Sequence, residues 1–281
     1  NTVTVDVAPD QVYRVNFGDN GDAFTASIFG TVFDDANVNG LWDADELGIP
    51  GVSVSIDGRM NGNPTSYVTN EYGQYTFPVD HTGTFTVTET DPAGYVSTVA
   101  IPGSDAVTAI DRNTLLAQVN GLGTDLGNNL FGDVLRDGIV AISGQVWDDN
   151  GAGTGTAGDG LLNGDEPGLP GARVTVVIAS VPGLGDVTGS DGAFLLYAPA
   201  GQAVTLVEEN PDGYLSTGAI AGNDATYVDD DTLSIAALAG GSSSTDNLFG
   251  DVLTTDVAVI TGVVFDDADE DGVLDLSLIH I

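Results

Sequence analysis

The chain has 281 residues, of which 42 are acidic and 5 are basic, so its formal charge is −37. Such a surface repels nucleic acid and anionic membrane, which argues against both as partners, and it attracts divalent cations. Lysine and cysteine are both absent, which excludes Schiff-base chemistry, thiol chemistry and disulfide bonds. An acidic proteome from a saline habitat is an alternative source of this composition.

Self-similarity is the strongest pattern in the sequence. A segment that begins near Gly30 returns near Gly144 and again near Gly262, at distances of 114 and 118 residues. Later landmarks, among them a Pro-x-Gly-Tyr turn and the closing Leu-Phe-Gly-Asp, return in the same order. The predicted domains are the closing strands of a repeat in 1–26, two full repeats in 27–140 and 141–258, and a truncated repeat in 259–281. We therefore expect a piece of a longer array, with a tail at 276–281 that leaves the pattern.

Within each repeat the pattern is that of β-structure. Segments such as 52–56, 84–88 and 174–177 are rich in β-branched residues, and turn sequences such as 91–94 separate them. We expect seven or eight short strands per repeat and no amphipathic helix. A unit of this length can bury its own core. The predicted fold is therefore all-β, with tandem β-sandwich modules arranged as beads.

Residues 35–46, directly after the first strand of a repeat, match the twelve-residue calcium loop in full. A hard dication takes six to eight oxygens, so alternate residues must turn inward, and Gly40 permits the tight turn at position 6. We expect ligation by side chains at positions 1, 3, 5, 9 and 12 and by the carbonyl at position 7, namely Asp35, Asn37, Asn39, Asp43, Glu46 and Leu41. The competing interpretation is a solvated acidic turn.

Two further copies of the loop follow in the same frame. The second contains an insertion of six residues, and its expected ligands are Asp149, Asp159, Leu161, Asn163 and Glu166. The third offers Asp267, Asp269, Asp271, Val273 and Asp275. Leu278 stands there in place of the closing glutamate, so we expect that loop to bind poorly. Strands rather than helices flank these loops, which favours a structural ion over a sensor.

Taken together, these motifs resemble the B-type repeats of serine–aspartate-repeat adhesins, which are relatives of collagen-adhesin B-type modules. The likeness rests on the loop with its flanking strand, the later Glu-Thr-x-Pro-x-Gly-Tyr run and the closing Asn-Leu-Phe-Gly-Asp, and it covers residues 1–275. It implies Ig-like or transthyretin-like Greek-key sandwiches, calcium-dependent rigidity and a stalk that holds a ligand-binding head away from a cell. Some relatives form a Lys–Asn isopeptide bond, which this lysine-free chain cannot do.

The expected function is that of a calcium-binding structural region of a secreted or cell-surface protein, acting as a stalk, spacer or fibre. We expect that the protein is not an enzyme. Adjacent carboxylates such as Glu208 and Glu209 lie on opposite faces of a strand, which argues against paired acid–base catalysis. The expected partners are calcium and neighbouring repeats, with no membrane insertion in this segment. Self-assembly into a homopolymer, a spacer role in a large secreted enzyme and a ligand-binding module remain open. A glycan site needs clustered exposed aromatics, and Tyr67, Tyr72 and Tyr75 come nearest to that.

Overall fold

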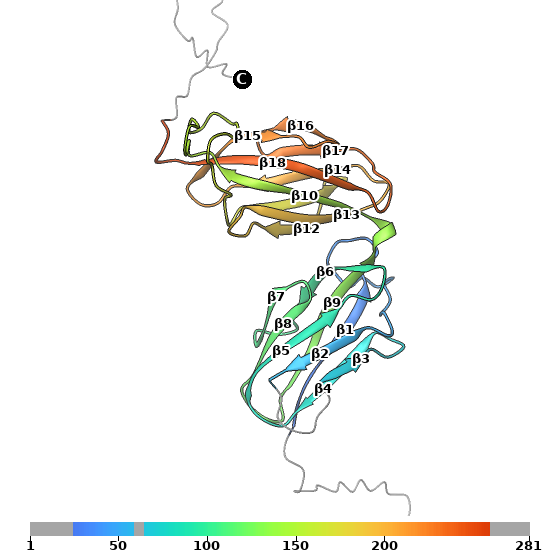
Figure 1. Cartoon of the computed structure of the whole chain (residues 1–281). Helices are drawn as coiled ribbons and strands as arrows, with labels where there is room; N and C mark the ends of the chain where they lie inside the picture. The colour runs from blue at the N-terminus through green and yellow to red at the C-terminus, as the bar shows by residue number, and fades with distance from the viewer. Residues whose placement is uncertain (1–24, 59–64, 259–281) are drawn as a thin grey trace, which may run out of the picture.

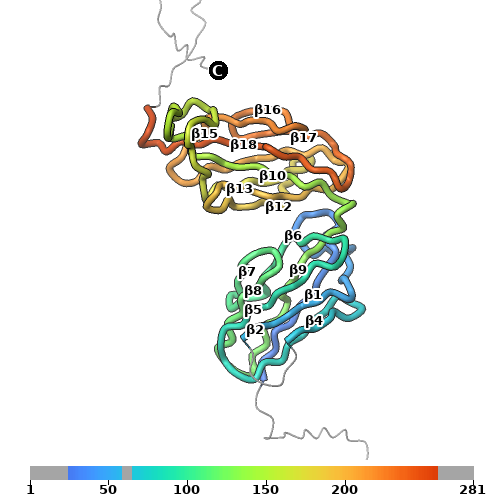
Figure 2. The backbone as a smooth tube through the Cα atoms, in the orientation of Figure 1, coloured from blue at the N-terminus to red at the C-terminus, as the bar shows by residue number. Residues whose placement is uncertain are grey.

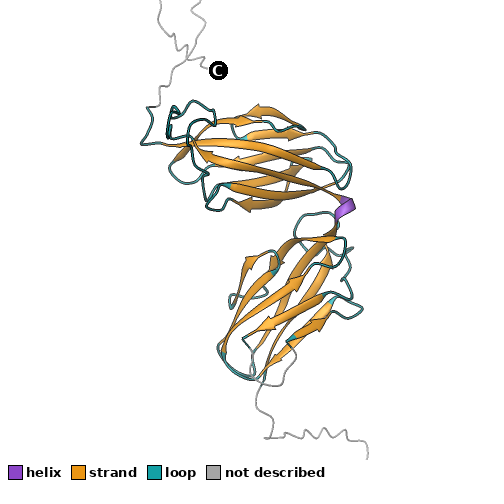
Figure 3. Cartoon of the chain, viewed as in Figure 1, coloured by secondary structure: helices purple, strands orange, loops and turns teal. Residues whose placement is uncertain are grey.

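The computed structural model describes residues 25–58 and 65–258. These residues form two consecutive β-sandwiches joined by one turn of 3-10 helix, η1 (Arg136–Gly138) (Figure 1). Loops and strands account for the rest of the described chain (Figure 3). The predicted all-β fold with tandem sandwich modules is confirmed.

Within the residues that the structure describes, each module contains nine strands, whereas seven or eight were expected. The additional strands are short hairpin partners whose side chains are mostly exposed, so they lack an apolar pattern. The strands of the first module are β1 (Ala26–Asp34), β2 (Ser53–Asp57), β3 (Ser66–Val68), β4 (Gln74–Val79), β5 (Gly83–Thr90), β6 (Tyr95–Ile101), β7 (Val107–Asp111), β8 (Thr114–Val119) and β9 (Asp125–Leu135). Those of the second are β10 (Ile139–Asp148), β11 (Arg173–Ile178), β12 (Val181–Val187), β13 (Ala193–Pro199), β14 (Val204–Glu209), β15 (Tyr214–Ile220), β16 (Ala225–Asp229), β17 (Thr232–Ile235) and β18 (Ser243–Leu253).

A four-stranded and a five-stranded sheet make up each module. The strand orders are β4-β1-β9-β6 and β3-β2-β5-β8-β7 in the first module, and β13-β10-β18-β15 and β12-β11-β14-β17-β16 in the second. The first and last strands of each module pair in parallel, whereas the other pairs are antiparallel. The chain therefore enters a module at one end and leaves it at the other (Figure 2).

The core lies between the two sheets. Strand β4 alternates strictly between exposed and buried residues, and its inward Phe77 packs in one cluster with Phe85 of β5 and Phe131 of β9. Pro78 is accommodated because β4 is an edge strand. Trp147 of β10 and its counterpart Phe33 of β1 are both fully buried near the ends of their strands. Each module thus buries a core of its own.

The glycines that define the repeat period lie where two backbones approach closely. A Cβ on Gly30 would stand 1.6 Å from the carbonyl oxygen of Asn129, and one on Gly144 would stand 1.7 Å from that of Asn247. Both positions follow a register shift in the parallel pairing of first and last strands. Glycine is required there because any side chain would force these central strands apart.

Candidate metal centre

The first predicted loop follows β1 and folds back on its own first residue. Asp35 is fully buried. Its Oδ1 accepts a hydrogen bond from the amide of Asn39 at 3.0 Å, and its Oδ2 accepts one from the amide of Gly40 at 3.1 Å. The first carboxylate is thereby placed at the centre of the loop.

Two residues of this loop have left-handed backbone conformations. Gly40 has φ +72°, which glycine adopts without cost, while Val38 has φ +58°, which is strained for a β-branched residue. The side chain of Val38 is buried all the same. Strain of this kind persists only where surrounding contacts impose it, so packing at Val38 holds the loop in shape.

The amide side chains of the loop gather around one carboxylate. Asn37 and Asn39 both donate through Nδ2 to Oδ2 of Asp43, at 2.9 and 2.8 Å. The amide of Leu41 donates to Oδ1 of Asn39 at 2.7 Å. The side chain of Leu41 is exposed, so only its main chain is available to the centre.

Glu46 closes the loop. Its Oε2 accepts a hydrogen bond from the amide of Asp43 at 3.0 Å, while its Oε1 is buried without a hydrogen-bond partner. Burial, followed by the negative charge of Asp35, raises the pKa of Glu46, and burial likewise raises the pKa of Asp35. The structure does not bring the carboxylates of Asp35, Asp43 and Glu46 all within 4.8 Å of one another. A loop rich in oxygen donors, with one buried oxygen that has no partner, nevertheless has the chemistry that a hard cation prefers.

The second loop reproduces this frame in spite of its insertion. Asp149 is fully buried, and its carboxylate accepts from the amides of Gly158 and Gly160 at 3.0 and 2.8 Å. These glycines have φ +73° and +71°, at the positions of Val38 and Gly40. The insertion therefore leaves the turn intact.

The closing half of the second loop is also preserved. Glu166 accepts from the amide of Asn163 at 2.8 Å, and Asn163 donates to Asp159 at 3.1 Å. The side chain of Leu161 is exposed, as is that of its counterpart in the first loop. The insertion adds one contact that the first loop does not have: the amide of Gly151 donates a hydrogen bond to Oε1 of Glu166 at 3.1 Å. One oxygen that is unpartnered in the first loop is thus hydrogen-bonded in the second.

The predicted ligands of the third loop lie outside the described residues. They are Asp267, Asp269, Asp271, Val273 and Asp275.

The aromatic cluster considered for glycan binding is not an exposed platform. Tyr75 is buried, and its hydroxyl donates to the carbonyl of Asn129 at 3.1 Å. Tyr67 packs edge-on against Phe77 of the core. Tyr72 alone of the three tyrosines is largely exposed, and a single ring makes no stacking surface.

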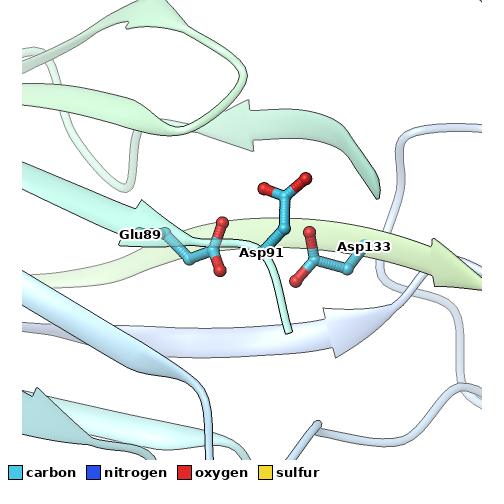
Figure 4. A group of neighbouring side chains, drawn as sticks. All are labelled: Glu89, Asp91 and Asp133. Atoms are coloured by element: carbon cyan, nitrogen blue, oxygen red, sulfur yellow. The ribbon is translucent and has the colours of Figure 1, made fainter. Parts of the chain in front are cut away.

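Sequence reasoning assigned no site to four buried carboxylates outside the loops. They are Glu89 and Asp133 in the first module (Figure 4) and Glu208 and Asp251 in the second. Glu208 is buried while its neighbour Glu209 is exposed, in line with the expectation that the two lie on opposite faces. The available indication was that each carboxylate recurs at the same place in both repeats.

Within the described residues, no helix is long and apolar enough to cross a bilayer.

The model of the family described as SdrD B-like domain matches residues 26–130. Serine-aspartate repeat-containing protein F of Staphylococcus epidermidis is 27% identical over 247 residues, which are 87% of this chain and 13% of that protein. Serine-aspartate repeat-containing protein D of Staphylococcus aureus strain Newman is 28% identical over 194 residues, 69% of this chain and 14% of that protein. The chain thus spans about one seventh of these relatives.

Among solved structures, the chain is similar to the shaft pilin SpaA of Lactobacillus rhamnosus GG, with a TM-score of 0.27 and 15% identity over 85% of this chain and 99% of the pilin. It is also similar to the Bacillus anthracis TIE protein, with a TM-score of 0.29 and 16% identity over 81% of this chain and 34% of that one. Residues 26–130 thus match the SdrD B-like domain, and the second module repeats the strand order of the first. These relatives place the chain at the cell surface or in the extracellular space.

Proposed function

We propose that the loops at 35–46 and 149–166 bind calcium, and that the bound ions stiffen a stalk or spacer built from these repeats. The role is mechanical rather than enzymatic. The observation that carries the proposal is the position of Val38. This residue lies at the centre of the first loop and packs into the junction between the two modules.

Topology brings the loop to the junction. Because β1 and β9 run in parallel, the loop that follows β1 lies at the end of the module from which β9 leaves. That end faces the second module across η1 (Figure 1). Parallel first and last strands also carry the chain from one end of each module to the other, which suits a stalk.

An apolar cluster joins the loop to both modules. Val38 is 2% exposed and belongs to a cluster with contributions from β6, β9, β10, β12 and β13, namely Val96, Val134, Ile139, Leu184 and Tyr197. Leu184 lies so close to the loop that a Cβ on Gly40 would stand 2.5 Å from its Cδ2. The conformation of the loop therefore decides whether the junction packs.

Arg112 adds a polar contact across the same junction. It lies in the β7–β8 turn of the first module and stands 3.6 Å from Asp186 of the second. It also donates to the carbonyl oxygen of Leu195, and its guanidinium lies 5.3 Å from the ring centre of Tyr197. A half-exposed ion pair is worth little by itself, so we assign it to orienting the modules.

The ion would act by removing repulsion inside the loop. Without it, the carboxylates of Asp35, Asp43 and Glu46 oppose one another's approach. A ligand that binds only the folded state raises the free energy of unfolding by about 2.7 kcal/mol when its concentration is 100 times its dissociation constant. Extracellular modules bind calcium at roughly 0.1–1 mM, so such loops would fill outside a cell.

Thermal unfolding and small-angle X-ray scattering of the chain, with calcium and with chelator, test this proposal. We expect calcium to raise the melting temperature and to narrow the distribution of particle dimensions. Asp35→Asn with Glu46→Gln should abolish both effects at the first module, whereas Asp45→Asn, an exposed position of the same loop, should leave them unchanged. Equal melting temperatures and scattering with and without calcium would show that the loops are only acidic turns.

A further inference from the structure

A hollow of about 380 Å³ lies beside the four-stranded sheet of the first module, with residues of β1, β4 and β9 in its lining. Along β1, Ile28 and Val32 belong to the core, whereas Phe29 and Thr31 line the hollow. Because side chains alternate between the two faces of a strand, these two residues reach the hollow from the face turned away from the core. Its volume is within the range of small-ligand sites, about 300–1,000 Å³.

Two exposed aromatic side chains border the hollow, Phe29 at 37% and Trp42 at 45% exposure. The ring of Trp42 stacks on that of Phe33, with centres 6.1 Å apart and planes at 25°. Phe33 follows Phe29 by four residues, which is roughly 13 Å along β1. Tyr67 and Tyr75 line the hollow too, but their rings pack against core rings. The free stacking surfaces are therefore those of Phe29 and Trp42, one at each end.

Thr31 lies between these two rings on the same face of β1. Its side chain is 6% exposed, and its hydroxyl makes no hydrogen bond with the described part of the chain. Buried polar groups in proteins are normally hydrogen-bonded. Since Thr31 lines the hollow, its hydroxyl is available to a ligand that enters there.

Strand β4 adds further neutral polar groups on the same face. Gln74 pairs with Thr31 and Thr76 pairs with Phe29 in the antiparallel register, and both side chains on β4 are exposed and line the hollow. Oε1 of Gln74 accepts a hydrogen bond from Nδ2 of Asn70 at 3.1 Å, which leaves the amide NH₂ of Gln74 for a ligand. Amides and hydroxyls both donate and accept hydrogen bonds, so the floor between the rings can pair with the hydroxyls of a ligand.

The lining of the hollow carries no charge. No aspartate, glutamate, arginine or histidine is among the described residues that line it, although the chain has 42 acidic residues. A cationic ligand would find no carboxylate partner there, and an anionic ligand would be repelled by the net charge of −37. The hollow is therefore suited to a neutral ligand.

The position of the hollow on a sheet face favours a sugar over an extended peptide. Strand β1 pairs with β4 on one side and with β9 on the other, so its backbone groups are already used within the sheet. An extended peptide gains affinity by pairing its backbone with an open sheet edge, which β1 does not offer. A sugar has apolar C–H faces that can stack on aromatic rings and hydroxyls that can pair with polar side chains.

The second module has the same fold without this combination of residues. The replacements are Ser143 for Phe29, Leu162 for Trp42, Ala193 for Gln74 and Leu195 for Thr76. Both exposed aromatic rings and the two polar groups of β4 are thus lost together. Because the second module folds with other residues at these positions, packing does not require the aromatic and polar lining of the first.

We propose that the hollow binds neutral oligosaccharides, with sugar rings stacked against Phe29 and Trp42 and sugar hydroxyls hydrogen-bonded to Thr31, Gln74 and Thr76. The first module is then an adhesive unit as well as a structural one. Trp42 lies within the loop at 35–46, but none of the expected calcium ligands lines the hollow. The sugar site is therefore independent of the proposed ion.

Tryptophan fluorescence of the full chain tests this proposal. The chain has two tryptophans, and because Trp147 is fully buried, a ligand in the hollow changes the emission of Trp42. The neutral probes are cellotriose, maltotriose and the trimer of N-acetylglucosamine, and sialyllactose is the charged comparison. We expect a saturable change in emission with at least one neutral trimer and none with sialyllactose.

Variants assign the binding to the hollow. Gln74→Ala, at an exposed position of β4, should weaken the affinity for the neutral trimer several-fold, up to about tenfold. Thr31→Val should weaken it similarly while leaving the melting temperature unchanged, because the hydroxyl has no partner in the described chain to lose. Trp42→Ala should abolish the signal of the trimer in saturation-transfer NMR. Tyr72→Ala removes an exposed ring outside the hollow and should change nothing.

The absence of a saturable change with every neutral trimer would overturn the proposal. Equal affinities in the wild type, Gln74→Ala and Thr31→Val would overturn it as well, because the sugar would then bind elsewhere. Hexaproline is the peptide probe, and its binding in place of the sugars would assign the hollow to a peptide. None of these results alters the expected effect of calcium on melting temperature and scattering, so this proposal and the proposed function fail separately.

Discussion

The amide of Asp35 donates a hydrogen bond of 2.8 Å to the carbonyl oxygen of Asp133, and Asp149 makes the same bond to Asp251 at 2.7 Å. Asp35 opens the proposed calcium loop, whereas the side chain of Asp133 is buried in the module. One peptide contact therefore links the first residue of each loop to a residue with a buried carboxylate in the same module.

This link predicts energetic coupling between Asp35 and Asp133. In a double-mutant cycle with Asp35→Asn and Asp133→Asn at saturating calcium, the changes in free energy of unfolding should depart from additivity by about 0.5–3 kcal/mol. Urea denaturation provides the measurement. Asp35→Asn combined with Asp251→Asn, in separate modules, serves as the control pair. Additivity in the first pair would mean that the shared hydrogen bond transmits nothing.

Gly40→Ala should loosen the junction. A left-handed φ of +72° costs an L-residue roughly 1–2 kcal/mol, and the new methyl would displace the side chain of Leu184. Gly51→Ala is the matched control, since it has φ +82° and open space around the Cβ. Both variants should lose similar stability by calorimetry. Only Gly40→Ala should broaden the scattering profile, and equal profiles would contradict the role of Leu184.

Thr69→Val should destabilise the first module by about 1–3 kcal/mol. The buried hydroxyl of Thr69 donates to the carbonyl of Ile49 at 2.7 Å and accepts from the amide of Val52 at 2.9 Å. Valine keeps the shape and removes both bonds. Thr188 bridges Leu169 and Ala172 in the same way in the second module. Thr76→Val, on the exposed face of β4, should change the free energy of unfolding by less than about 0.5 kcal/mol.

Arg112→Ala should affect orientation more than stability. The residue contacts Asp186, Leu195 and Tyr197 of the second module, but a half-exposed ion pair contributes only about 0–1 kcal/mol. We expect a small change in melting temperature together with faster proteolysis near η1. Asp230→Ala, at the equivalent position of the second module, is the control. Cleavage that is no faster than in the control would argue against an orienting role.

The stability of the calcium-free protein should fall as pH rises. Folding raises the pKa of Glu89 from 4.5 to about 9 and that of Asp133 from 3.8 to about 7. The charges that face them are those of Asp91 and Asp34, besides each other. A raised carboxyl pKa means that the folded state binds the extra protons, so this stabilisation is complete below about pH 4 and is lost by about pH 9.

Urea denaturation at pH 5, 7 and 9 without calcium measures this dependence. Glu89→Gln with Asp133→Asn should flatten the contribution of the first module, because the amides do not titrate. The general self-repulsion of an acidic chain also grows with pH, and the difference between wild type and variant removes that component. Parallel curves for the two proteins would show that these carboxylates are ionised in both states.

The turn of the proposed calcium loop was predictable because its residues are local, whereas ion binding stays a prediction. All the expected ligands of the first loop lie within twelve positions, and the turn that gathers them depends on Gly40 and on side chains a few residues apart. The same locality explains why the second loop was recognised despite its insertion, since Gly158 and Gly160 restore the left-handed positions. The repeats and their β-structure were likewise predictable from the local pattern of residues.

Only the tertiary structure determined which side chains come together between the two sheets and at the junction between the modules. Glu89 and Asp133 come together because β5 and β9 lie in facing sheets, and their spacing along the chain gives no hint of this. Val38 and Leu184 belong to one cluster because the parallel pairing of β1 with β9 brings the loop to the exit end of the module. Backbone pairing over long sequence separations creates both contacts. Local composition therefore predicted the loops, whereas the buried carboxylate groups and the packed junction are consequences of the fold.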